Sequence, residues 1–247
     1  MLLRRVTKHV KDQNWFAVGI DFAIVVVGVF IGLQVANWND ARSQKADERQ
    51  LILTLADEAT ELKIALFDYR TVHTEIAEAN FEFGKRLEDP DACAKVDDTY
   101  KRLVLSASDF PPPRFSVATI DGLIGSGRSQ LIGSVDLRDR ISEMADEFDF
   151  IERQWTRYVD VKRTLELMLV TQSGFSVTEP GDLSHGTWDT DMGRFDFRTP
   201  QNLCDNPEIV GALSNAAITQ EIYLNILDQA AVKLEAYSES LDQQIGG

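Results

Sequence analysis

The residue types that most often carry chemistry are few in this chain and poorly spaced for it. It has three histidines and two cysteines, too few for a zinc cluster built from these ligands. Gly122, Gly125 and Gly127 form a glycine-rich stretch, but the Gly-Lys-Ser/Thr that completes a phosphate-binding loop does not follow it. We therefore expect these glycines to end a helix, and not to bind phosphate.

A metal site is the second chemical hypothesis. One acid-rich loop also contains a histidine, and its candidate ligands are Asp182, His185, Asp189 and Asp191. Their irregular spacing favours solvated turn residues. His73 falls on an apolar helical seam, which favours a histidine of the core. No nucleophile has a partner base at a recognisable spacing, so the sequence predicts no catalytic residue, metal ligand or cofactor, and disfavours an enzyme.

Charge is distributed unevenly along the 247 residues. Lys and Arg number 25 against 40 Asp and Glu, and the net charge of −15 disfavours nucleic acid as a partner because phosphates would be repelled. Residues 1–14 hold four basic and one acidic residue (+3), whereas residues 40–247 hold 21 and 38 (−17). Between them, residues 15–39 contain a single charged residue, Asp21. This pattern is typical of a protein with one membrane span.

The apolar run begins at Trp15 and continues for 22 residues, which would form about 33 Å of helix, roughly the thickness of a bilayer core. Trp15 and Trp38 bracket it, as tryptophans do at membrane interfaces. The positive-inside rule places residues 1–14 in the cytoplasm as a basic tail, residues 15–38 in the membrane, and residues 39–247 outside. In a bacterium, the location is the inner membrane and the outer part is periplasmic.

Two other interpretations of the apolar run are weighed against this one. A cleaved signal peptide has a similar start, but its small-residue cleavage site is poorly formed at Gln34-Val35-Ala36. A buried core helix is disfavoured by the flanking charges and by the uninterrupted apolar stretch 22–33. The basic tail itself is either a topogenic signal or a short amphipathic helix on the inner leaflet, and the sequence leaves both open.

Three residues of the span have the character of a helix–helix contact. Gly28 and Gly32 are four apart, a spacing that lets another helix approach closely. Asp21 lies six residues after Trp15, so about 9 Å into the apolar region. It either reaches the cytoplasmic headgroups or contacts a donor on a neighbouring helix. The predicted partners are therefore the lipid bilayer and another integral membrane protein or complex, while a homo-oligomer stays open.

The rest of the chain predicts an all-α fold. Apolar residues recur at steps of three and four along three long series, at residues 51–83, 141–168 and 209–245. No Pro or Gly interrupts residues 33–83, so the membrane helix is expected to continue outward until Gly84 and Pro90 end it. We expect an N-terminal transmembrane helix that continues into an antiparallel periplasmic helical bundle.

Local signals place the remaining boundaries. Ser134 and Asn206 are good N-caps for the second and third long helices, and Gly174 is expected to end the second. Short helices are expected at 95–107 and 117–124, and an extended strut at Pro111-Pro112-Pro113. Residues 174–205 have no helical period and are expected to form one long irregular loop, in which a β-hairpin is poorly signalled.

The two cysteines, Cys93 and Cys204, are candidates for a disulfide, because the periplasm is oxidising. If the three long helices alternate in direction, Cys93 lies at the far end of the bundle and Cys204 near the membrane. The bond then requires residues 174–205 to return along the bundle, a distance that 32 residues can cover at about 3.3 Å each.

Two blocks of the sequence resemble a known family. The segment Gln34-Val35-Ala36-Asn37-Trp38-Asn39, after the apolar helix, is similar to the opening of a bacterial family of single-span, membrane-anchored proteins of unknown function. Residues 119–152 also resemble that family, which has there a short helix, a Ser-Gly turn and a Leu-Ile pair before a long helix. These blocks cover about a quarter of the chain. The resemblance implies the topology and the helical body, and it implies no activity.

Two classes of function follow. The favoured one is an accessory or scaffold subunit whose span and bundle bind a larger membrane complex. The alternative is a periplasmic bundle that senses a ligand. Such sensors normally pass a signal to a cytoplasmic output domain, and only residues 1–14 are predicted to be cytoplasmic here, which favours the first class.

Overall fold

The protein is described by a computed structural model, which covers residues 15–178, 195–197, 200–204 and 206–246. The chain divides into two compact units, residues 1–51 and residues 52–247. Helix α2 (Trp15–Glu88) contributes to both units. The prediction that the helix continues past the apolar run is confirmed. The prediction that Gly84 ends the helix is wrong, because Gly84 lies within α2, which continues to Glu88.

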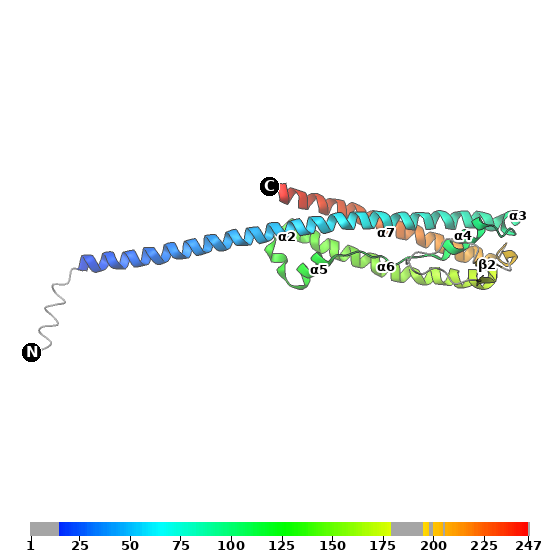
Figure 1. Ribbon diagram of the computed structural model, residues 1–247, viewed down its shortest axis with the longest axis horizontal. Helices are drawn as coiled ribbons and strands as arrows, with labels where there is room; N and C mark the ends of the chain where they lie inside the picture. Colours follow the sequence, from blue (N-terminus) through cyan, green and yellow to red (C-terminus); the bar gives the residue numbers. More distant parts are fainter. Residues whose placement is uncertain (1–14, 179–194, 198–199, 205, 247) are drawn as a thin grey trace, which may run out of the picture. The chain divides into compact units, whose positions relative to one another are not determined.

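The second unit is built from three long helices and several short elements, and its fold is all-α apart from one small sheet (Figure 1). The long helices are the later part of α2, α6 (Val135–Ser173) and α7 (Pro207–Gly246). The predicted caps are confirmed, since Ser134 Oγ accepts from Leu137 N at 3.2 Å and Asn206 Oδ1 accepts from Glu208 N at 3.0 Å. Gly174, at φ 63°, follows α6 in the left-handed conformation that glycine tolerates best.

The short elements lie between α2 and α6. They are α3 (Pro90–Cys93), α4 (Asp98–Ser108), α5 (Ala118–Gly125) and the 3₁₀ turn η1 (Arg128–Leu131). The expectation that Pro90 ends a helix was incomplete, because the same proline also begins α3 after an Asp89 cap. Residues 109–117 have no regular structure, as the three prolines predict.

The directions of the long helices differ from simple alternation. Helix α7 runs antiparallel to α2. Lys63 Nζ lies 2.7 Å from Glu235 Oε2, and the hydroxyl oxygens of Tyr69 and Tyr223 are 3.0 Å apart, so a later residue of α2 contacts an earlier residue of α7. Helix α6 runs parallel to α2, because the segment between them returns along α2 first. The Tyr69 hydroxyl donates to the carbonyl of Pro111 at 2.9 Å. Eight residues later in the chain, Thr119 of α5 donates to Glu58, which precedes Tyr69 on α2, so the segment runs toward the start of α2.

Helix α5 is held at its N-terminus by a residue of α2. Its own N-cap position, Val117, supplies no side-chain hydrogen bond. Instead the carboxylate of Glu58, 9% exposed, accepts from Thr119 N at 2.7 Å and from Ile120 N at 3.2 Å. A carboxylate there satisfies two of the unpaired amides and complements the helix dipole. The contact therefore fixes where α5 lies along α2.

The end of the second unit opposite α5 contains the sheet and a large apolar cluster. Strand β1 (Phe175–Val177) pairs antiparallel with β2 (Phe195–Phe197), so the poorly signalled strand pair is present. The 3₁₀ turn η3 (Pro200–Asn202) follows. The cluster joins side chains of α2, α4, α6, β2 and α7, and its buried members include Phe83, Tyr100, Leu169, Phe197 and Leu213. Burial of these faces is the main source of the fold's stability.

Candidate functional site

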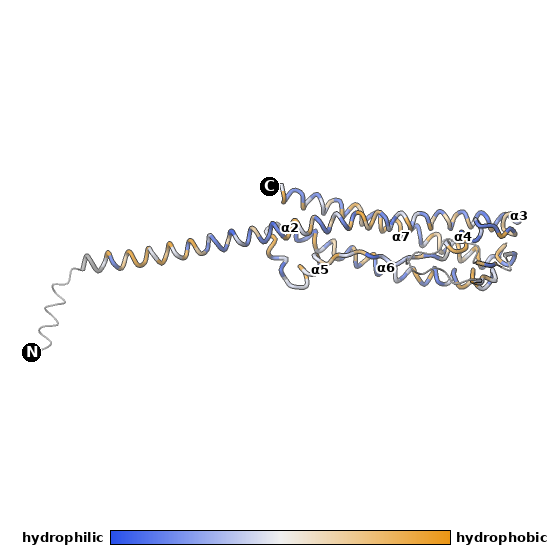
Figure 2. Tube along the Cα trace, in the orientation of Figure 1, coloured by the Kyte–Doolittle hydropathy of each residue, from blue (hydrophilic) through white to orange (hydrophobic). Residues whose placement is uncertain are grey.

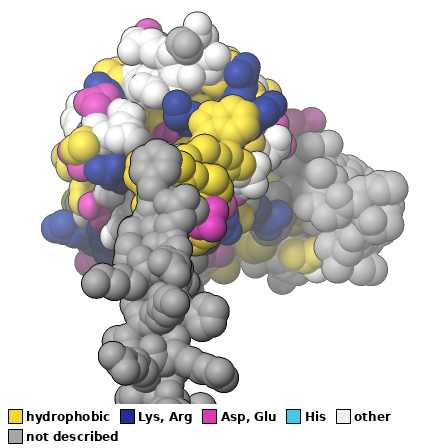
Figure 3. Space-filling view, turned by 90° about the vertical axis from the view of Figure 1, so that its left-hand side faces the viewer, with side chains coloured by type: hydrophobic (Ala, Val, Ile, Leu, Met, Phe, Trp, Pro, Cys, Tyr) yellow, Lys and Arg dark blue, Asp and Glu magenta, His cyan; other side chains and the backbone are white. Residues whose placement is uncertain are grey.

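The apolar part of α2 is the first candidate site, because it leaves large hydrophobic side chains uncovered. Phe22, Phe30 and Leu33 are 70%, 61% and 59% exposed. By length and composition this helix can cross a membrane, with a mean hydropathy of 2.2 over its most apolar 18 residues. Figure 2 shows the apolar start of α2 in orange, and Figure 3 shows hydrophobic side chains gathered at its described N-terminal end.

Asp21, Gly28 and Gly32 lie on one side of this helix. A turn of 100° per residue separates Asp21 from Gly28 by about 20° around the axis, and Gly28 from Gly32 by about 40°. A Cβ built at either glycine would have no neighbouring atom within 4 Å, so both glycines leave open space on the helix surface. The structure brings these three residues into one stripe about 16 Å long.

Of the two tryptophans that bracket the apolar run, the structure describes the side chain of Trp38. Trp38 is 65% exposed, and the guanidinium carbon of Arg42 lies 5.9 Å from its ring centroid. An aromatic ring beside a cation suits the boundary between lipid tails and headgroups. The side chain of Trp15 lies outside the described part of the structure.

A polar cluster at the centre of the bundle is the second candidate site. His73 is fully buried, and its Nδ1 accepts from the Gln220 amide nitrogen at 2.7 Å, while the same nitrogen donates to the His73 carbonyl at 3.0 Å. The rings of Phe110 and Tyr223 lie 5.0 Å from the imidazole. Burial, together with the charge of Lys162, lowers the pKa of His73 to about 4, so the imidazole is neutral at pH 7.

Lys162 belongs to the same interior. It is 1% exposed and donates from Nζ to the Ala107 carbonyl at 3.0 Å. With its amide oriented to suit both neighbours, Asn80 donates to the Ala107 carbonyl at 3.2 Å and accepts from Lys162 Nζ at 2.9 Å. Burial lowers the pKa of Lys162 to about 8, and the charge of Asp109 opposes that shift. Desolvation in turn raises the pKa of Asp109.

These groups form a packed polar interior. The imidazole is enclosed by aromatic rings, and the ammonium is held by a carbonyl and an amide. Within the described ranges no three His, Cys, Asp or Glu residues lie close enough to hold a metal ion. The candidate metal ligands Asp182, His185, Asp189 and Asp191 lie outside those ranges. The Gly122–Gly127 stretch ends α5, and Gly127 adopts φ 67° there.

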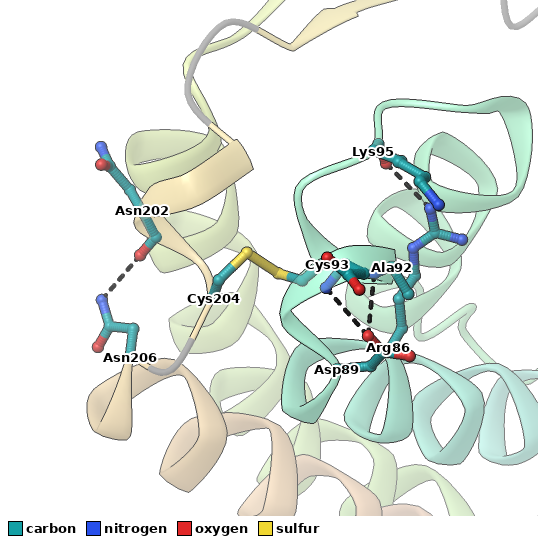
Figure 4. Close-up of a disulfide and its surroundings, with 9 residues drawn as sticks. Arg86, Asp89, Ala92, Cys93, Lys95, Asn202, Cys204 and Asn206 are labelled. Atoms are coloured by element: carbon teal, nitrogen blue, oxygen red, sulfur yellow. Dashed lines mark hydrogen bonds between the residues drawn. A yellow bond between two sulfur atoms is a disulfide. The ribbon is translucent and has the colours of Figure 1, made fainter.

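Cys93 and Cys204 form a disulfide with a Cα–Cα distance of 5.8 Å (Figure 4). The sequence argument required residues 174–205 to return along the bundle, and that requirement was wrong. The extended segment 109–117 already carries the chain back, so α6 ends at the same end of the unit as Cys93. The bond therefore joins α3 to the turn before α7 and encloses the 110 residues between the two cysteines.

A groove between α2 and α7 has a volume of about 300 Å³. Its lining includes Asn80, Phe81, Lys85, Leu213 and Ser214. The Lys85 ammonium lies 4.3 Å from the centroid of the Phe81 ring and covers apolar surface. The polar side chains of the lining are Asn80, Lys85, Glu88 and Ser214, and their chemistry does not single out one class of ligand.

Sequence reasoning missed several residues that matter in the second unit. Glu58 falls on the apolar seam of the first series, yet nothing local indicates that it caps α5, 61 residues later. Gln220 and Lys162 are polar positions on otherwise apolar series. That irregularity is the one signal that could have singled them out, although it does not identify their partners.

Comparison of the chain with protein-family models, with curated proteins and with solved structures finds no match.

Proposed function

We propose that the chain is a single-span, membrane-anchored accessory or scaffold subunit of the bacterial inner membrane. In this proposal residues 39–247 are periplasmic, and the span and the bundle together bind a larger membrane protein complex. The exposed apolar helix and the charge asymmetry on either side of it support membrane anchoring. The proposal assigns the chain no catalytic activity.

The stripe of Asp21, Gly28 and Gly32 carries the proposal of a partner. Lipid tails give apolar helices no hydrophobic reason to associate, so helices in a membrane associate through close packing and polar contacts. Two glycines with open space over them permit close packing. A carboxylate two turns earlier is costly in lipid and is stabilised by a donor on a second helix.

Substitutions in the span test the proposal. Gly28→Leu with Gly32→Leu keeps the helix apolar and should leave insertion intact, but it places two large side chains where a partner must approach. We expect this pair to lose the membrane protein that co-purifies with the wild-type chain in mild detergent. Asp21→Leu should ease insertion and weaken the same association.

The opposite face of the span provides a matched control. Val26 and Phe30 have the same four-residue spacing and lie about 140° and 180° around the axis from the centre of the glycine face. Val26→Leu with Phe30→Leu should therefore retain the partner. If replacing the whole span by an unrelated apolar helix also retains it, the span is only an anchor and the proposed helix contact is wrong. If only a second copy of the chain co-purifies, the stripe is a homo-oligomer contact.

A further inference from the structure

His73 and Gln220 meet through a single nitrogen atom, and this geometry fixes the protonation state of the histidine. The Gln220 amide nitrogen lies 2.7 Å from His73 Nδ1 and 3.0 Å from the His73 carbonyl oxygen. An amide nitrogen donates and does not accept, so Nδ1 must accept and carries no proton. Both side chains are fully buried, and the contact joins α2 to α7.

A proton on Nδ1 of His73 is incompatible with this contact in either orientation of the amide. If the nitrogen of Gln220 stays in place, it faces the new N–H, which is a second donor. If the amide turns, its oxygen accepts from Nδ1 but then lies against the His73 carbonyl oxygen, which is a second acceptor. Because the imidazolium carries a proton on each ring nitrogen, protonation breaks at least one of the two hydrogen bonds.

The rings that enclose His73 do not supply a negative charge. Tyr69 of α2 lies 4.5 Å from the imidazole and Tyr223 of α7 lies 5.0 Å from it, both measured between ring centroids. Burial raises the pKa of both hydroxyls, so both side chains are neutral at and below pH 7. A protonated His73 therefore has to find its stabilisation in water.

The charged groups around His73 also favour its neutral form. Burial and the like charge of Lys162 on α6 lower the pKa of His73, and the carbonyl of Pro111 and the side chain of Gln220 oppose them more weakly. Asp109 is the counter-charge that acts on Lys162, but desolvation raises the pKa of Asp109. Acid therefore neutralises Asp109 sooner than an ordinary aspartate, and the cation beside His73 loses this support.

Residues 109–117, which we call the strap, close the interior over His73. The ring of Phe110 is 6% exposed and lies 5.0 Å from the imidazole. The Trp155 indole donates to the Phe110 carbonyl at 3.1 Å, and the Tyr69 hydroxyl donates to the carbonyl of the next residue at 2.9 Å. The strap has no regular structure, and its three prolines have no amide hydrogen to donate. Among the elements around His73, it is the one that opens at the lowest free energy.

We propose that the strap is an acid-released element: protonation of His73 breaks its contact with Gln220, and the strap separates from the imidazole so that the charged ring reaches water. The long helices stay packed through their apolar seams, so the change is a local opening. Release uncovers the aromatic rings around His73 and gives the bundle an apolar surface at low pH. All of these groups lie in the second unit, so the device does not depend on the proposed membrane anchoring.

The indole hydrogen of Trp155 reports on the strap, because it is bonded to the Phe110 carbonyl. Its exchange rate is measured by NMR on the full chain in detergent micelles and divided by that of free tryptophan at the same pH. An imidazole with a pKa of about 4 under the strap and of about 6.5 in water predicts an open fraction about 20-fold larger at pH 5 than at pH 7. We expect the exchange rate to rise by this factor.

Two variants identify the group that is responsible. His73→Gln removes the titrating group and should abolish the rise. Asp109→Asn, a matched change on the strap itself, should retain it. An equal rise in wild type and His73→Gln, no rise in wild type, or loss of the rise in Asp109→Asn would overturn the proposal. The backbone amides of residues 141–151 in α6 should stay protected at pH 5, and an equal rise there would show that the whole bundle opens, which also overturns it.

A second measurement on the wild-type chain does not depend on any variant folding. The carbon-13 signal of the His73 imidazole is followed from pH 8 to pH 4. We expect the signal of neutral imidazole down to about pH 5. An ordinary titration near pH 6.5 with the Trp155 indole still protected would show that His73 is charged beneath a closed strap, and would overturn the proposal.

Discussion

At the scale of single residues, the bundle's interior is more polar than its apolar seams suggest. The Gln220 amide uses its nitrogen for both bonds to His73, while His73 Nε2 and Gln220 Oε1 have no hydrogen-bond partner among the described residues. Buried polar groups without partners cost free energy. The unpaired atoms of His73 and Gln220 therefore lower the stability of the fold. Protonation of His73 at acid pH should lower it further.

Replacement of His73 should change how stability depends on pH. An ordinary histidine has a pKa of about 6.5, and burial lowers that of His73 to about 4. Between these values the unfolded chain binds a proton that the folded chain does not, so stability falls as pH falls from 6.5 to 4, by about 3 kcal/mol. His73→Gln should lose that contribution.

Urea unfolding in detergent micelles at several pH values measures the effect. Trp155 reports on this region, because its indole donates to the Phe110 carbonyl at 3.1 Å. As the pH is lowered, the unfolding free energy of the wild type should fall more steeply than that of His73→Gln. Any stability advantage of the wild type at pH 7 should therefore shrink or reverse. Parallel curves for the two proteins would show that His73 does not titrate in this range.

Glu58 should matter for one helix more than for the whole fold. Glu58→Ala removes both acceptors of the α5 N-terminus, and loss of a helix cap costs about 1–2 kcal/mol. We expect faster hydrogen exchange at the amides of Thr119 and Ile120. Glu61→Ala, an exposed change on the same helix, is the control and should leave those amides protected. Equal exchange in both variants would contradict the capping role.

At the scale of elements, the sequence predicts the helices better than their arrangement. The three apolar series and the caps at Ser134 and Asn206 are local patterns, so α6 and α7 begin where expected. Helix α6 runs parallel to α2 because residues 109–117 first carry the chain back along α2. The sequence pattern of this irregular segment does not predict its direction or its length along the bundle. The contacts of Glu58 with α5 and of His73 with Gln220 join distant parts of the chain, so they depend on packing.

The disulfide should contribute strongly to the stability of these elements. Closing a loop of 110 residues stabilises a fold by about 4–5 kcal/mol through the entropy of the unfolded chain. The double variant Cys93→Ser, Cys204→Ser should lose about that much unfolding free energy, which a urea titration would show as a lower midpoint. The wild-type chain under reducing conditions should match the double variant. Alkylation of both thiols in native, unreduced protein would show that the bond does not form in the cell.

At the scale of the whole molecule, charge asymmetry is the feature that predicts topology. The net charge of +3 before the apolar run and of −17 after residue 39 should hold the N-terminus in the cytoplasm. Alkaline phosphatase fused after Gly247 should therefore be active, and a fluorescent protein that matures only in the cytoplasm should be dark at the same position. The reverse pattern would contradict the predicted location of the bundle.

The position of the disulfide also determines which parts of the chain bear load. Tension applied at the two ends enters through α2, crosses the sulfur–sulfur bond between Cys93 and Cys204, and leaves through α7. The 110 residues between the cysteines, which include α4, α5 and α6, carry none of it, and about 380 Å of extended chain stays slack. The bond thus keeps the enclosed residues out of the covalent path of the load, but α4 and α6 still depend on their packing against α2 and α7, which bear it.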